Sequence, residues 1–131
     1  MVKKAIRILI VDDELEVVKP IRLYLVQQGF EVFTAATAED GLERLAVGDI
    51  DVGIIDNMLP GVSGPELIRK AHDSGSTTKF LMFTGTVDFP VPDILKEINF
   101  SSMQVLFKPL PSLKFAVEVI ESLIAGKLQA G

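Results

Sequence analysis

Residues 52–64 read VGIIDNMLPGVSG, a short apolar run that ends in an aspartate and enters a loop rich in proline and glycine. Three other apolar runs also end at a polar residue: ILIVDDE at 8–14, FLMFT at 80–84 and VLFK at 105–108. Short continuous runs rich in β-branched or aromatic residues are typical of strands that are buried on both faces. A fifth run, EVFTA at 31–35, alternates more and indicates an edge strand.

Segments of helical length separate these strands. Leu15, Val18, Ile21 and Leu25 have helical spacing, and such spacing gives a helix one apolar face. Alternation of strand and helix predicts βαβ units, and therefore one α/β domain with a parallel sheet covered by helices on both faces. The expected helices are residues 14–28, Glu39–Val47 capped by Thr37, a third from Ser63 and Pro65 to about His72, a short fourth near Asp93–Asn99 after Pro90 and Pro92, and a last one after Pro111 with Phe115, Val119 and Leu123 on one face.

Pro20 conflicts with the first of these helices. A proline in a helix interior removes a hydrogen bond and clashes with the preceding turn, which costs roughly 3 kcal/mol. Two interpretations stay open: the helix begins near Lys19 with Pro20 in its first turn, or a longer helix kinks at Pro20.

Composition excludes several classes of protein. The 131 residues carry 13 Lys and Arg against 18 Asp and Glu, a formal net charge of −5, and an acidic domain repels nucleic-acid phosphates. No apolar run approaches the roughly 20 residues that span a bilayer, and the N-terminal run lacks a cleavage site for a signal peptide. With no cysteine and the single His72, thiolate sites and His-rich metal sites are excluded. We therefore expect a cytoplasmic domain with no direct nucleic-acid binding and no membrane association.

The polar residues at the strand ends point to one site. Ligands of open parallel sheets bind outside the carboxyl ends of the strands, where the strand order reverses. A single aspartate there usually caps the next helix. Here Asp12, Asp13, Asp56, Thr84 and Lys108 would all meet at one edge, which favours a functional site over helix capping.

The chain resembles the receiver domains of two-component response regulators over essentially its whole length. The resemblance depends on Asp12-Asp13, the run from Asp56 to Gly64, Thr84-Gly85 and Lys108-Pro109, in that order and strand context. It implies a doubly wound, flavodoxin-like sheet of five parallel strands in the order 2-1-3-4-5. The expected domain covers residues 1–131, with a core over about residues 5–126.

The resemblance also implies a role for each site residue. Asp56 is the expected phosphoacceptor, because a carboxylate can attack phosphorus to form an aspartyl phosphate. Mg²⁺ would offset the repulsion between Asp56 and an anionic phosphodonor, since it prefers oxygen ligands. The implied roles are Asp13, Asp56 and the Met58 carbonyl as metal ligands, Asp12 as a ligand through water, Lys108 and Thr84 as phosphoryl-binding residues, Gly85 as the opening for the donor, and Pro60, Gly64 and Pro109 as residues that shape the loops. Lys108 is expected to pair with Asp56 when no phosphoryl group is present.

A signalling switch, phosphorylated by a histidine kinase or a histidine phosphotransfer protein, is the leading functional hypothesis. It would turn over no external substrate and would act on a downstream output domain or protein, with a homodimer as one option. One rival is a Mg²⁺-dependent aspartyl-phosphate phosphatase or phosphotransferase, which usually has an acid two residues after the nucleophile, where this chain has Met58. The other is a pseudo-receiver that only binds a partner, and the full set of site residues counts against it.

Two further expectations concern how phosphorylation would be passed on to a downstream output domain or protein. Receivers commonly carry an aromatic residue three positions before the lysine, and Val105 stands there in this chain. We therefore expect phosphorylation to move the segment 86–100 instead, with a merely variable loop as the alternative. No output domain follows in the sequence, so a stand-alone receiver and a piece of a longer regulator or hybrid kinase both stay open.

Overall fold

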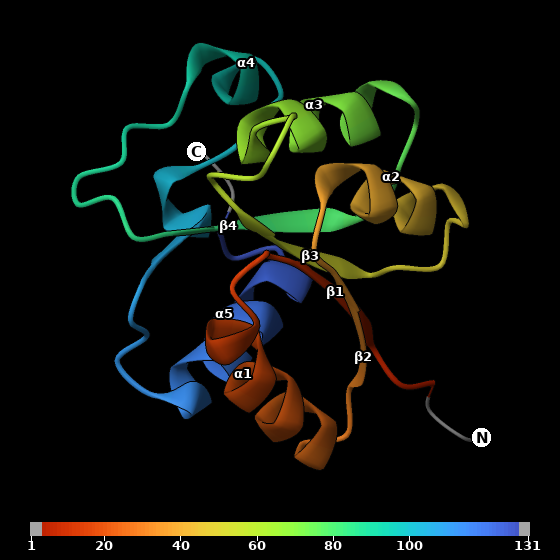
Figure 1. The fold of residues 1–131 in the computed structure, drawn as a ribbon, viewed down its shortest axis with the longest axis vertical. Coiled ribbons are helices and arrows are strands. Elements are labelled where there is room, and N and C mark those ends of the chain that lie inside the picture. The colour runs from red at the N-terminus through yellow and green to blue at the C-terminus, as the bar shows by residue number, and fades with distance from the viewer. Residues whose placement is uncertain (1–3, 129–131) are drawn as a thin grey trace.

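Five parallel strands form the centre of the computed structural model, in the order β2-β1-β3-β4-β5 (Figure 1). The structure describes residues 4–128, so the expected domain ends at residues 1 and 131 lie outside the described residues. The strand order and the parallel pairing confirm the predicted doubly wound fold. The elements are β1 Arg7–Val11, α1 Leu15–Gln27, β2 Glu31–Ala35, α2 Ala38–Ala46, β3 Val52–Asp56, α3 Gly64–Asp73, β4 Lys79–Thr84, α4 Asp93–Lys96, the 3₁₀ helix η1 Ser102–Gln104, β5 Val105–Phe107 and α5 Leu113–Ile124.

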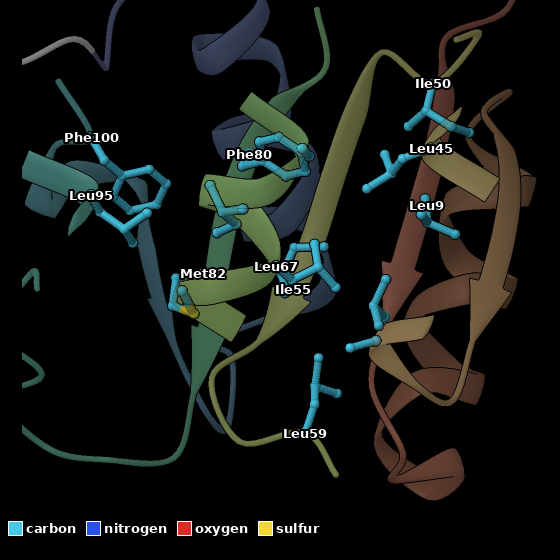
Figure 2. Packing of buried hydrophobic residues seen from close by; sticks show 14 of the residues in the cluster. Leu9, Leu45, Ile50, Ile55, Leu59, Leu67, Phe80, Met82, Leu95 and Phe100 are labelled. Carbon is cyan, nitrogen blue, oxygen red and sulfur yellow. The ribbon is translucent and has the colours of Figure 1, made fainter. Parts of the chain in front are cut away.

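Helices cover both faces of the sheet, as the alternating pattern predicts. On one face, α2, α3 and α4 pack on a buried cluster that includes Leu9, Ile55 and Met82 (Figure 2). On the other face, α1 and α5 pack on Ile8, Ile10 and other strand residues. Successive residues of β1 thus enter different clusters, which explains why its whole run is apolar.

Side-chain caps begin three of the α-helices. The side chains of Thr37 and Ser63 accept hydrogen bonds from the backbone N–H groups of Asp40 and Glu66, as predicted for α2 and α3. Ser112 caps α5 in the same way.

Two expectations about helices are corrected. The helix α1 begins at Leu15 and continues through Pro20, so the interpretation that it begins near Lys19 is wrong. On α5, the buried residues are Ala116, Ile120 and Leu123, whereas Phe115 is exposed. Apolar residues of α5 lie on several sides of the helix, so the periodicity of its sequence alone did not identify the buried face.

The fourth helix is short, as the two prolines predict. It begins at Asp93, and Asn99, with a φ of 62°, adopts the left-handed conformation that ends it before the predicted limit. Arg69 of α3 holds this helix, because its guanidinium donates to the Ile94 carbonyl at 2.8 Å and to Glu97 at 2.6 Å. None of the helices within residues 4–128 has the length and apolar character that a membrane crossing needs.

Candidate functional site

Four neighbouring strands deliver polar residues to one edge of the sheet. Asp12 and Asp13 follow β1, Asp56 ends β3, Thr84 ends β4 and Lys108 follows β5. The strand order reverses between β1 and β3, because the chain first adds β2 on one side of β1 and then β3 on the other. The acids therefore lie at the point where ligands of such sheets bind.

The three aspartates form a compact acidic cluster. One carboxylate oxygen from each of Asp12, Asp13 and Asp56 lies within 4.8 Å of the others. Asp12 and Asp56 are buried, with exposed fractions of 2% and 5%, whereas Asp13 is exposed. Burial, and then the charge of Asp12, raises the pKa of Asp56, and the nearby Lys108 opposes this effect. An ionised Asp56 is therefore costly in the free protein.

Lys108, which follows β5, contacts the acidic cluster at the ends of β1 and β3. Its Nζ lies 2.8 Å from Glu14 Oε1, 3.0 Å from Asp12 Oδ2 and 3.5 Å from Asp56 Oδ1. Burial works against the charge of the ammonium, but hydrogen bonds with Glu14 and Asp12 outweigh it, so the pKa of Lys108 is raised. The expected pairing with Asp56 is thus the longest of the three contacts, and Glu14 is the closest partner.

Sequence reasoning missed this role of Glu14. The residue stands beside the two aspartates in the run at 12–14, but the resemblance assigns it no role. Its contact with Lys108 joins residues 94 positions apart. No local sequence pattern could indicate that contact. The third acid at the same strand end could only have marked Glu14 as a further candidate site residue.

The loop after Asp56 is shaped by close backbone contacts. The Met58 N–H donates to Asp56 Oδ1 at 3.3 Å, and the Gly64 N–H donates to the Asn57 carbonyl at 2.9 Å. A Cβ atom at Gly64 would overlap the carbonyl oxygen of Asp56, so a side chain does not fit there. A turn follows at Pro60, whose carbonyl accepts a hydrogen bond from the Val62 N–H at 3.2 Å.

Thr84 and Gly85 border the cluster on the β4 side. The Thr84 hydroxyl is buried and accepts a hydrogen bond from the Thr86 N–H at 3.0 Å, so its own proton can be donated to a ligand. A Cβ atom at Gly85 would meet nothing within 4 Å, so this side of the site is open. The Lys108-Pro109 peptide bond is cis.

The residues present fit a hard divalent cation such as Mg²⁺. Three carboxylates are oxygen ligands of the type that Mg²⁺ prefers. Asp12 Oδ2 is buried, and the ammonium of Lys108, 3.0 Å away, is its only partner among the described residues. A carboxylate oxygen has two lone pairs, so Asp12 Oδ2 can also accept from a metal-bound water.

An apolar groove of about 910 Å³ opens beside the cluster, between α1 and the start of α5. Its floor includes Asp56 and Lys108, and Val17, Pro20 and Leu110 are among its apolar lining residues. The proline inside α1 therefore contributes to a surface next to the acids.

Comparison with known proteins agrees with this geometry. A family model described as "Response regulator receiver domain" matches residues 8–119. The regulatory protein VanR of Enterococcus faecium is 42% identical over 79 residues, which are 60% of this chain and 34% of that protein. The transcriptional regulatory protein YkoG of Bacillus subtilis, itself uncharacterized, is 29% identical over 102 residues, which are 78% of this chain and 44% of that protein. The chain thus spans less than half the length of these relatives.

Solved structures match over nearly the whole chain. A CheY-like response regulator receiver domain from Methanospirillum hungatei has a TM-score of 0.80 and 26% identity, covering 95% of this chain and 97% of that one. A receiver domain from Clostridium thermocellum has a TM-score of 0.79 and 28% identity, covering 93% and 96%. These similarities agree with the parallel strand order of the sheet.

Proposed function

Because the chain belongs to the response regulator receiver domain family, we propose that it is a phosphoacceptor switch of a two-component phosphorelay, phosphorylated on Asp56. The observation that carries this proposal is the position of Asp56, buried at the switch point of the sheet within reach of two other aspartates and of Lys108. We propose that residues 1–131 belong to one domain with a core over about residues 5–126.

The chemical step is transfer of a phosphoryl group to a carboxylate. An Asp56 carboxylate oxygen attacks the phosphorus atom, and the bond from phosphorus to the donor's histidine nitrogen breaks, with the nitrogen keeping the electron pair. Hydrolysis of the aspartyl phosphate returns the free carboxylate. The protein is changed by this step but turns over no external substrate, so we do not class it as an enzyme.

The acids would hold Mg²⁺ for this step. Asp13, Asp56 and the Met58 carbonyl are the proposed direct ligands, and Asp12 is a ligand through water. When bound, the cation supplies positive charge between the carboxylate and the phosphodonor. The exposure of Asp13 leaves a path for the ion to enter.

The remaining site residues would bind and admit the phosphoryl group. Lys108 supplies an ammonium and Thr84 a hydroxyl proton to phosphoryl oxygens. Gly85 leaves room for the donor. Pro60, Gly64 and Pro109 fix the loops that carry Asp56 and Lys108.

The partner would be a histidine kinase or a histidine phosphotransfer protein that docks in the groove beside Asp56. The groove's apolar lining suits a protein surface more than a small anionic donor. VanR and YkoG are longer than this chain and are named as regulators, which supports a downstream output domain or protein, with a homodimer as another option. We place the domain in the cytoplasm, where such kinases act, without direct contact to nucleic acid or membrane.

Two rival functions are tested by the same reaction. An aspartyl-phosphate phosphatase or phosphotransferase would release phosphate continuously, but the usual second acid is replaced by the exposed Met58. A pseudo-receiver would take up no phosphoryl group.

Incubation with a small phosphodonor such as acetyl phosphate and Mg²⁺ tests the proposal by intact mass. We expect the mass of one phosphoryl group on the wild-type protein and none on Asp56→Asn. The matched control is Asp51→Asn, because Asp51 precedes the same strand at its opposite end and accepts from the Arg7 N–H. Equal phosphorylation of Asp56→Asn would mean that another residue is the phosphoacceptor. Sustained release of phosphate would favour the phosphatase function.

A further inference from the structure

We propose that Glu14 is a positioning residue that draws the Lys108 ammonium toward the start of α1, which leaves only its longest contact for Asp56 until a phosphoryl group arrives. This inference depends on the function proposed above. It assigns a role in the same site to a residue that the resemblance leaves without one.

The contacts of Lys108 favour the β1 side of the site. Its Nζ lies closer to Glu14 and Asp12, at 2.8 and 3.0 Å, than to Asp56, at 3.5 Å. Of the three carboxylates that contact Lys108, Glu14 is the exposed one, with a side chain that is 58% exposed. The ammonium is thus drawn away from the phosphoacceptor and toward the start of α1.

The start of α1 differs from the starts of the other long helices. Hydroxyl side chains of Thr37, Ser63 and Ser112 cap α2, α3 and α5 by accepting backbone hydrogen bonds. Glu14 occupies the same position at α1, but its side chain makes no capping hydrogen bond. Its carboxylate instead binds Lys108 across the site.

This arrangement makes Glu14 a competitor of the incoming anion. A phosphoryl group on Asp56 must bind the ammonium that Glu14 holds, and therefore weakens an existing ion pair. Glu14 then sets how strongly the site binds a phosphoryl-like anion, and it does so through Lys108. The Glu14→Gln variant keeps the size and a hydrogen-bond acceptor but removes the competing charge.

The test measures binding of beryllofluoride, a phosphoryl mimic, at saturating Mg²⁺. We expect Glu14→Gln to lower the half-saturating concentration by about twofold to fivefold, the range for a partly exposed ion pair. The matched control is Glu16→Gln, which removes the same charge from an exposed glutamate in the first turn of α1 and should change nothing. Equal effects of the two variants would overturn the proposal.

A double-mutant cycle with Lys108→Ala separates positioning from simple repulsion. If Glu14 acts through Lys108, its substitution should have less than half the effect in the Lys108→Ala background. An equal effect in both backgrounds would show that Glu14 acts directly on the anion, and the proposal would be wrong.

A spectroscopic measurement on the ion-free protein gives an independent answer. In ¹³C-lysine-labelled protein, the Cε–Hε signal of Lys108, assigned by its loss in Lys108→Ala, should shift in Glu14→Gln and stay in place in Glu16→Gln. An unmoved signal in Glu14→Gln would contradict the proposal even if Lys108→Ala binds no beryllofluoride. Absence of beryllofluoride binding to the wild-type protein would instead count against the proposed function.

Discussion

Strand β1 has a charged cluster at each end, and the two clusters are built differently. At the amino end, Arg7 forms ion pairs with Glu31 and Asp49, and Arg44 pairs with the same Asp49 at 2.6 Å. These side chains are 24% to 47% exposed, and their charges balance. Both guanidinium groups also lie over the ring of Phe33, Arg44 at 4.2 Å and Arg7 at 5.9 Å.

At the carboxyl end, the charges do not balance and two of the acids are buried. Within the described residues, Lys108 is the only cation that pairs with this cluster, through Asp12 and Asp56, and it also pairs with Glu14. The consequences for the acids are opposite. A hydrogen bond from Arg44 lowers the pKa of Asp49, whereas burial and Asp12 raise the pKa of Asp56.

This contrast separates a structural ion-pair network from a functional site. Groups that only stabilise a fold gain partners that favour their charged form. Groups that bind a ligand can be held where their charged form is unfavourable, and the bound ligand then stabilises that form. The two ends of β1 can therefore be distinguished by experiment.

The largest expected difference between the two ends of β1 concerns metal binding. Asp13→Ala should weaken Mg²⁺ binding by about tenfold or more, because it removes a proposed ligand from the carboxyl end of β1. Asp49→Ala at the amino end should leave Mg²⁺ affinity unchanged. Isothermal titration of both variants measures this, and unchanged affinity in Asp13→Ala would remove Asp13 from the proposed site.

The loop behind the carboxyl end should tolerate little added volume. Gly64→Ala should destabilise the protein by about 2 kcal/mol, because its Cβ would overlap the backbone oxygen of Asp56 and backbone cannot move aside cheaply. Gly85→Ala is the control, since the space around it is open. Urea denaturation gives both values, and equal stabilities would show that the close contact is not needed.

Neutralising Asp56 should stabilise the metal-free protein. The pKa of Asp56 in the folded protein is raised above its ordinary value of 3.8, so folding favours the protonated carboxyl group. The resulting gain in folding stability is complete below pH 3.8 and is lost as the pH rises through the folded-state pKa. In the presence of a chelator, Asp56→Asn should therefore gain on the order of 1 kcal/mol at pH 7, and the gain should disappear at low pH. Thermal unfolding at several pH values measures it, and a destabilised variant at pH 7 would contradict the argument.

The smallest effect is expected at the amino end. Asp49→Asn should lower Tm slightly at pH 7, and the loss should fade as the pH drops through the lowered pKa of Asp49. Added salt should also reduce it, because the Debye length is about 3 Å at 1 M salt. A loss that persists in 1 M NaCl would mean that the hydrogen bonds from Arg44 to Asp49, and not long-range charge attraction, account for it.

Much of the fold was readable from the sequence because its signals are local. The strands of the sheet, the caps at Thr37 and Ser63 and the short fourth helix all depend on residues within a few positions of one another. The candidate site was readable for the same reason, since each polar residue directly follows an apolar run and parallel strands end at one edge.

The sequence by itself determined which chemical groups reach that edge, whereas the tertiary structure decided which of them pair. The choice of Glu14 over Asp56 as the closest partner of Lys108 depends on distances between residues 94 positions apart. The buried face of α5 was decided in the same way, by contact with β-strand residues rather than by its largely apolar sequence. Local patterns fix backbone conformation over a few residues, but ion pairs and packing depend on the positions of atoms that only the complete fold brings together.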